Sequence, residues 1–208
     1  MMSKLLKQCR KPSGLLGEII VRGMNRRHAR VTDWGLGHVS IGRHDTIPDV
    51  GCGGGETVRK LAEPAQEGQV YDIDLSEVSV SASRRRNRQF IRAGRVDIRY
   101  GAVSCLPYPD GQFDLVTAVE THYFWPDLVS DMREILRVLK PGGKLLIIGE
   151  AYKGGKYDER NRRWVQWCGL AYHGIKELGG VLSAAGYAGV QVFEEYERGW
   201  LCGLGKKP

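Results

Sequence analysis

Paired cysteines and long apolar runs are both missing from this chain of 208 residues. The five cysteines are an odd number, and no Cys-x-x-Cys pair or cysteine–histidine cluster has the spacing of zinc ligands. No uninterrupted apolar stretch reaches the length of a membrane span, and Glu18 interrupts the apolar part of the N-terminal segment. The sequence therefore predicts a reduced, cytoplasmic protein without a structural metal, an export signal or a membrane span.

Acidic residues are outnumbered, since Lys and Arg number 31 and Asp and Glu number 24, which gives a formal net charge of +7. Such an excess can favour a nucleic acid, an anionic membrane surface or an acidic substrate, but many basic enzymes bind none of these. The densest basic run, residues 84–88, falls within a predicted helix and has no aromatic platform beside it. We interpret this run as a solvated helix face.

Short apolar segments alternate with longer helical ones after Thr46, which indicates repeated strand–helix units and a parallel sheet. The predicted strands are residues 47–50, 69–73, 97–100, 113–119, 144–148, 190–196 and 200–204. The predicted helices are residues 56–62, 77–93, 128–139 and 175–185, with a turn at 140–143. We therefore predict a doubly wound, Rossmann-like α/β fold with a mostly parallel seven-stranded sheet, a C-terminal antiparallel hairpin and an N-terminal helical cap.

Two details of this pattern are less regular. The N-terminal cap is expected to break around residues 28–32, where Thr32 or Asp33 would begin a second short helix. Pro48 cannot donate to a sheet ladder, so the first strand is expected to start late or to leave one position unpaired.

A glycine-rich stretch, DVGCGGG at residues 49–55, follows the first predicted strand. Such a loop brings backbone N–H groups and a helix N-terminus against a ligand. Its spacing is neither the pyrophosphate-binding G-x-G-x-x-G nor a P-loop, which requires Gly-Lys-Ser/Thr. Asp49 opens the loop, and its carboxylate would repel a phosphate but suit a cation or an ammonium group, so we expect a positively charged ligand. Cys52 is expected to fill a small space in the loop.

A second acidic position, Asp74, lies at the predicted carboxyl end of the second strand, about 20 residues past the loop. A carboxylate there can accept hydrogen bonds from both hydroxyls of a ribose. Asp72 would point to the same face, and Ser76 can cap the helix that follows.

Four motifs in one order, DVGCGGG, VYDIDLS, LPYPDGQFDLV and REILRVLKPGGKL, make the chain resemble the class I S-adenosylmethionine-dependent methyltransferases. The resemblance is to their small-molecule, methyltransferase domain 11-like branch and covers most of the chain from about residue 46. It implies S-adenosylmethionine as the cofactor and S-adenosylhomocysteine as a product. The implied cofactor-binding residues are Asp49, Gly51, Gly53, Gly55, Asp74, Leu75, Val103 and Glu120.

The resemblance also implies what these residues contact. The glycines would surround the methionine part of the cofactor, Asp74 would hold the ribose and Leu75 would lie against the adenine. Ala102 stands where many relatives have an acid, which leaves adenine recognition to backbone groups such as those of Val103 and to apolar packing.

The implied activity is methyl transfer to a nucleophilic O, N, S or C atom of a small molecule. His122 follows the fourth predicted strand and is the first candidate for a base, because an imidazole near its ordinary pKa takes a proton at neutral pH. Glu120 and Tyr123 are the reserve candidates. Trp164 and Trp167 would either line a pocket for an apolar or planar acceptor or fill a core.

A single domain suits this length. We expect residues 1–45 to form the helical cap, 46–150 the cofactor-binding core, and 151–208 a substrate-covering segment with the final hairpin, in a monomer or homodimer.

Two other functions stay open: a non-catalytic module that binds the cofactor or a protein, and a nucleic-acid methyltransferase. The sequence has no added RNA-binding domain and no Asn/Asp-Pro-Pro-Tyr/Phe motif, which disfavours a nucleic-acid partner. The loop spacing and Asp49 argue against a nicotinamide cofactor.

Overall fold

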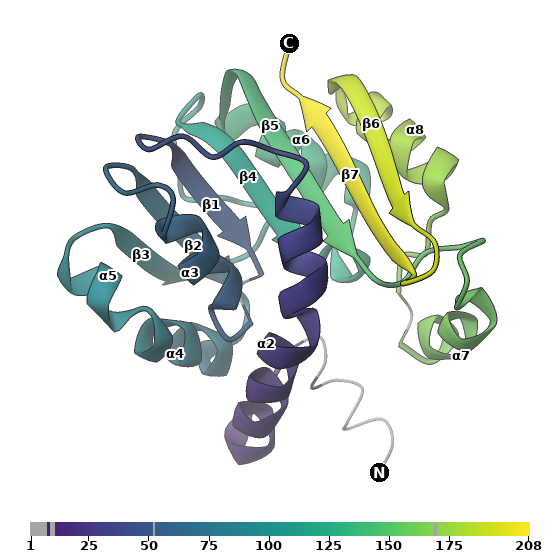
Figure 1. Cartoon of the computed structure of the whole chain (residues 1–208), viewed down its shortest axis with the longest axis horizontal. Helices are drawn as coiled ribbons and strands as arrows, with labels where there is room; N and C mark the ends of the chain where they lie inside the picture. Colours follow the sequence, from purple (N-terminus) through teal and green to yellow (C-terminus); the bar gives the residue numbers. More distant parts are fainter. Residues whose placement is uncertain (1–7, 9–10, 52, 169) are drawn as a thin grey trace. The chain divides into compact units, whose positions relative to one another are not determined.

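A computed structural model describes residues 8, 11–51, 53–168 and 170–208; Cys52 lies outside them. The chain forms two compact units, Met1–Ala102 and Val103–Pro208, in each of which strands and helices alternate (Figure 1). The division of a single domain into residues 1–45, 46–150 and 151–208 stays a prediction.

The first unit contains three parallel strands in the order β3-β2-β1. Their bounds are β1 Thr46–Val50, β2 Gln69–Asp74 and β3 Val96–Tyr100. The helices that connect them are α3 Glu56–Ala62, α4 Glu77–Arg86 and α5 Arg88–Arg92. Pro48 lies inside β1 in register with Tyr71, and the strand begins at Thr46, so the expectation of a late start is wrong.

Helix α2 (Gly14–Leu36) precedes these strands and is continuous, so the break expected at residues 28–32 is absent. The Thr32 hydroxyl, expected to cap a new helix, instead donates to the His28 carbonyl at 2.7 Å, one helical turn earlier. One face of α2 is buried, and it carries mostly small or β-branched side chains: Gly17, Val21, Val31, Thr32 and Gly35. This face continues past His28, and its burial favours a single helix over two.

The helix expected over residues 77–93 is divided at Asn87 into α4 and α5. Asn87 is buried, and its side-chain amide donates to the carbonyls of Ser83 at 3.0 Å and Gly55 at 2.9 Å. The second bond reaches the glycine loop, so a tertiary contact ends α4 where local propensity would continue it. Ser76 caps α4 as expected, because its hydroxyl oxygen accepts from the Ser79 N–H at 3.1 Å.

The second unit contains four strands in the order β4-β5-β7-β6. Their bounds are β4 Phe113–Val119, β5 Leu139–Gly149, β6 Ala188–Glu195 and β7 Trp200–Lys206. The helical elements are the 3₁₀ turn η1 His122–Phe124 and helices α6 Leu128–Val138, α7 Asp158–Cys168 and α8 Ile175–Ala185. Strands β4 and β5 are parallel, and β7 runs antiparallel to both β5 and β6.

Strand β5 begins at Leu139, whereas the sequence predicted a helix up to residue 139 and a turn at 140–143. Leu139 already pairs with Phe113, and the register then shifts before Leu115 pairs with Lys144. The Pro-Gly-Gly turn is therefore an irregularity within the strand.

Together the strands and their connections confirm the predicted doubly wound α/β class, with a mostly parallel set of seven strands and an antiparallel C-terminal hairpin. Among the described helices, none combines the length and the apolar character needed to cross a bilayer.

Candidate functional site

The glycine loop follows β1 and is held in backbone conformations that favour glycine. Gly51, Gly53 and Gly55 have φ angles of 92°, 49° and 79°, and the Gly51 N–H donates to the Ile73 carbonyl at 2.8 Å. A Cβ atom added at Gly53 would meet nothing within 4 Å, so open space adjoins the backbone at the middle of the loop. A ligand can approach this backbone closely.

Asp74, at the carboxyl end of β2, joins this loop to the next helix. One carboxylate oxygen accepts from the Gly53 N–H at 3.1 Å, and the other accepts from the Ser76 N–H at 2.7 Å. Leu75 beside it is 42% exposed. The structure thus brings Gly53 and Asp74 together, with Leu75 next to Asp74 in the chain; their contacts with a cofactor stay a prediction.

The other acids of this region are buried. Asp49 is 1% exposed, and it stands in register with Asp72, which is fully buried and accepts from the Ser83 hydroxyl at 2.9 Å. Asp72 therefore supports the strand–helix packing beneath the loop rather than facing a ligand.

Three polar side chains that sequence reasoning did not single out support the loop from behind. Asn25, on α2, donates to the Gly54 carbonyl at 3.0 Å, and a Cβ at Gly54 would collide with the Asn25 side chain. Behind Gly55 lie Ser83 and Asn87, both within 3 Å of where a Cβ would stand. These contacts join residues 28 to 32 positions apart along the chain, so no local sequence pattern indicates them.

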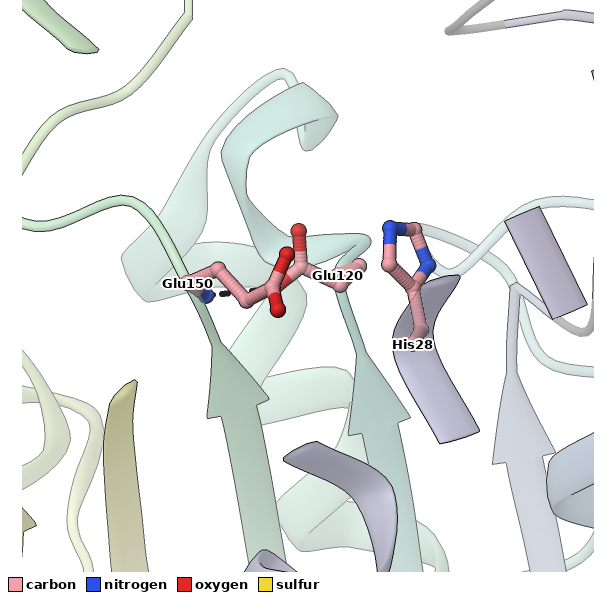
Figure 2. Close-up of side chains that lie close together, drawn as sticks. All are labelled: His28, Glu120 and Glu150. Carbon is pink, nitrogen blue, oxygen red and sulfur yellow. Dashed lines mark hydrogen bonds between the residues drawn. The ribbon is translucent and has the colours of Figure 1, made fainter. Parts of the chain in front are cut away.

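In the second unit, the carboxyl ends of β4 and β5 carry a polar network. Glu120 follows β4 with a φ of 58°, a left-handed conformation that is uncommon for a residue other than glycine. Its Oε1 accepts from the backbone N–H of Glu150, which follows β5 (Figure 2), and from the Tyr123 hydroxyl at 3.3 Å. The Tyr123 oxygen in turn accepts from the Ala151 N–H at 3.1 Å. The network ties the two strand ends together.

Burial determines the protonation of the two aromatic candidates. Burial, together with the Glu120 charge, raises the pKa of Tyr123 well above its ordinary value, so this hydroxyl stays protonated. His122 is 4% exposed, and burial, with a smaller effect of His173, lowers its pKa to about 3. The imidazole is therefore neutral at pH 7 but a weaker base than its ordinary pKa would make it.

His122 also has an unusual polar environment. Its ring lies against Tyr123, with centroids 4.0 Å apart, and its buried Nδ1 has no hydrogen-bond partner within the described residues. The pKa of His173 is likewise lowered by burial, and its buried Nδ1 also has no hydrogen-bond partner among the described residues. Two neutral imidazoles near one strand edge can each accept or donate a hydrogen bond.

The segment after β5 is held against this network by tyrosines. The Tyr172 hydroxyl donates to the Asp158 carboxylate at 2.6 Å and lies 2.8 Å from the Tyr152 carbonyl, while the Ala171 N–H donates to the Tyr123 carbonyl at 2.9 Å. Trp164 is half-buried on α7, and the side chain of Trp167 lies outside the described part of the structure. Val103, at the start of the second unit, is 6% exposed, and its contact with adenine stays a prediction.

Comparison with known proteins gives matches over most of the chain. Residues 48–147 match the model of a family described as a methyltransferase domain. The 27-O-demethylrifamycin SV methyltransferase of Amycolatopsis mediterranei is 36% identical over 118 residues, which cover 57% of this chain and 43% of that protein. The demethylmenaquinone methyltransferase of Bacillus licheniformis is 24% identical over 189 residues, with 80% of each chain covered. This chain thus spans less than half the length of the first of these relatives.

Among solved structures, a SAM dependent methyltransferase from Aquifex aeolicus has a TM-score of 0.76 and 19% identity, over 92% of this chain and 98% of that one. At this identity the similarity concerns the fold.

Proposed function

We propose that this chain, whose residues 48–147 match the methyltransferase domain family, transfers a methyl group from S-adenosylmethionine to an apolar or planar small molecule. The relatives support the predicted family, the predicted cofactor and the predicted class of small-molecule methyltransferase. The acceptor and the residues that act on it belong to the proposal.

The observation that carries the proposal is the pairing of Asp74 with the Gly53 N–H beside open space. In this arrangement Gly51, Gly53 and Gly55 would lie along the cofactor, and Asp74 would accept from its ribose hydroxyls. Leu75, which is substantially exposed, would cover the adenine. When bound, S-adenosylmethionine supplies a methyl group on a positively charged sulfur, which suits a loop that begins with an aspartate.

In the second unit we assign the acceptor site to the ends of β4 and β5. The rings there, those of Tyr123, His122 and His173, are uncharged at pH 7, as a planar or apolar acceptor of the quinone type requires. The acidic side chain of Glu120 is engaged by the Tyr123 hydroxyl and the Glu150 N–H. We infer this acceptor type from the names of the relatives, which include demethylmenaquinone and 2-phytyl-1,4-naphtoquinone methyltransferases.

Among the candidate catalytic residues, we propose that His122 acts as a neutral hydrogen-bond acceptor for an acceptor hydroxyl. Its unpartnered Nδ1 can take that bond, and its low pKa means that it orients the hydroxyl more than it deprotonates it beforehand. Tyr123 stays protonated and donates to Glu120, which fixes both side chains. The acceptor hydroxyl loses its proton to the Nδ1 of His122 as its oxygen takes the methyl group. A methylated hydroxyl oxygen is acidic enough to protonate a weak base, and proximity and alignment supply most of the gain, so no strong base is required.

The first test is calorimetric titration with S-adenosylmethionine and, separately, with NAD. We expect saturable binding of S-adenosylmethionine only. Asp74→Asn should weaken it about 10-fold to 100-fold, because hydrogen bonds to a charged acceptor contribute roughly 1.5–3 kcal/mol. Asp97→Asn is the matched control, since Asp97 lies on the neighbouring strand β3 and pairs with Arg99. Equal effects of the two variants would refute the assignment of Asp74.

The second test follows a labelled methyl group from S-adenosylmethionine into a panel of naphthohydroquinones, hydroquinones and catechols, with RNA and DNA beside them. Label in a small aromatic acceptor is the expected result. Cofactor binding without product throughout the panel would favour a non-catalytic binding module, and label in nucleic acid would favour the other alternative. We further infer a cytoplasmic enzyme, as the sequence predicts, that works as a monomer or homodimer.

A further inference from the structure

The outward face of helix α2 is apolar at one end and basic along the rest. Leu15, Leu16 and Ile19 are 84%, 47% and 67% exposed. The same exposed stripe continues at helical spacing with four arginines: Arg22, Arg26, Arg27 and Arg30. Single exposed apolar side chains are ordinary, but three adjoining ones at the end of a basic stripe call for an explanation.

Other positions of α2 already anchor the helix within its own unit. Asn25 donates to the glycine loop, and the Lys60 ammonium donates to the Ala29 carbonyl at 3.1 Å and pairs with Asp33. These contacts and the buried face hold the helix in place, and none of them uses a side chain of the exposed stripe.

Three of the four arginines of the stripe have no acidic partner in the part of the chain that the structure describes. The acids of α2 have partners elsewhere, since Glu18 lies 3.6 Å from Arg85 and Asp33 pairs with Lys60. Within the described residues, no carboxylate pairs with Arg22, Arg26 or Arg30. The stripe is thus a cationic surface that ends in an apolar tip.

We propose that this stripe docks on an anionic lipid bilayer. Leu15, Leu16 and Ile19 would enter the boundary between headgroups and acyl chains, while the arginines lie at the level of the lipid phosphates. Apolar side chains next to a basic face are the composition of helices that lie in a membrane interface, and each basic residue adds attraction to anionic lipid. A nucleic acid would complement the charge of the arginines but would leave the apolar side chains of Leu15, Leu16 and Ile19 exposed to water.

Docking of this kind would hold the chain at the surface in which lipid-soluble acceptors of the proposed methyl transfer are dissolved. Membrane docking rests on the proposed function only for its benefit. It is a separate property of the chain, because neither the arginines nor the apolar residues of the stripe belong to the proposed cofactor or acceptor sites. Binding to vesicles and binding of S-adenosylmethionine can therefore succeed or fail independently.

The test is co-sedimentation with vesicles of phosphatidylcholine containing 40% phosphatidylglycerol or none, at about 0.1 M and 0.5 M salt. We expect binding to the anionic vesicles that weakens in high salt. The apolar variant carries three substitutions: Leu15→Ser, Leu16→Ser and Ile19→Ser. Its vesicle affinity should fall about tenfold or more, whereas Tyr196→Ser, which removes a 50% exposed aromatic ring elsewhere, should bind as the unchanged chain does.

The charge variant carries Arg22→Gln, Arg26→Gln and Arg30→Gln. Its matched control removes three exposed arginines from other elements: Arg88→Gln, Arg92→Gln and Arg163→Gln. Each stripe arginine should contribute about fivefold, and the three together on the order of 100-fold, with little change in the control. Thermal melts and the affinity for S-adenosylmethionine should be unchanged in every variant.

Three results would overturn the proposal. One is the absence of binding to anionic vesicles at low salt. Another is an equal loss in the charge variant and its control, which would mean that net charge acts without regard to position. The third is a concentration-dependent dimer that the apolar variant dissociates while no vesicles are bound, which would make the stripe an interface between two copies of the chain.

Discussion

Replacing Gly55 by alanine should be among the most destabilising changes in the first unit. Gly55 has a φ of 79°, and its added Cβ would stand 2.8 Å from the Cα of Ser83, 2.5 Å from the Ser83 hydroxyl and 2.6 Å from the Asn87 amide. The Ser83 Cα is backbone and cannot turn aside as a flexible side chain would. Helix α4 would have to move away from the loop.

The magnitude follows from three contributions. A left-handed conformation costs an alanine roughly 1–2 kcal/mol, and overpacking against a fixed backbone costs roughly 1–3 kcal/mol. Moving Asn87 away from the Gly55 carbonyl, at 2.9 Å, loses a buried hydrogen bond of about 1 kcal/mol. We therefore expect the free energy of unfolding to fall by about 3–6 kcal/mol.

Gly94→Ala separates strain from collision. Gly94 has a similar φ of 71°, but an added Cβ meets nothing within 4 Å, so only the conformational cost of roughly 1–2 kcal/mol applies. Urea unfolding of the two variants and the unchanged chain measures the difference, and affinity for S-adenosylmethionine should fall in Gly55→Ala alone. If the two variants unfolded within about 1 kcal/mol of each other, the packing account of the loop would be refuted.

Two further predictions concern the second unit. A Cβ at Gly149 would collide with the Tyr123 hydroxyl, so Gly149→Ala should lower turnover about 100-fold and change the affinity for S-adenosylmethionine by no more than about twofold. The control Gly180→Ala, at an open helix position, should leave both quantities unchanged. Loss of cofactor binding in Gly149→Ala would contradict this prediction. Because burial lowers the pKa of His122 to about 3, below its unfolded value near 6.5, the folded chain favours the neutral imidazole. The stability from this group is complete above about pH 6.5 and declines by about 1.4 kcal/mol per pH unit as the pH falls toward 3. In urea titrations from pH 7 to 4.5, His122→Gln should flatten this decline and His44→Gln, at an exposed position, should not; parallel curves for all three proteins would contradict the burial of His122.

Much of the fold could be predicted because its signals are local. The strand at Phe113–Val119 and the helices at Glu56–Ala62 and Ile175–Ala185 have the predicted bounds, since each joins an apolar pattern to clear turn residues. The cofactor loop could be found for the same reason, because its glycines and Asp74 stand in a short, recognisable pattern.

The errors arise where distant residues decide the structure. Asn87 ends α4 because its side chain reaches Gly55, 32 residues away, and helix propensity alone cannot indicate this. Thr32 has the chemistry of a cap, but the buried face of α2 continues past it. The altered pKa values of His122 and Tyr123 depend on how deeply both side chains are buried at the end of β4. The sequence predicts that both residues follow a strand, but it does not indicate the depth of burial.

The network at the ends of β4 and β5 bears on the range of acceptors. Glu120 Oε1 and the Tyr123 hydroxyl are engaged with each other and with the N–H groups of Glu150 and Ala151. Polar groups engaged in this way contribute little to distinguishing one acceptor from another by hydrogen bonding. Selection would then depend on the acceptor hydroxyl that His122 is proposed to orient and on the outline of the acceptor, and outline discriminates weakly between molecules that differ by a methylene. An enzyme built like this should be promiscuous among acceptors of similar outline.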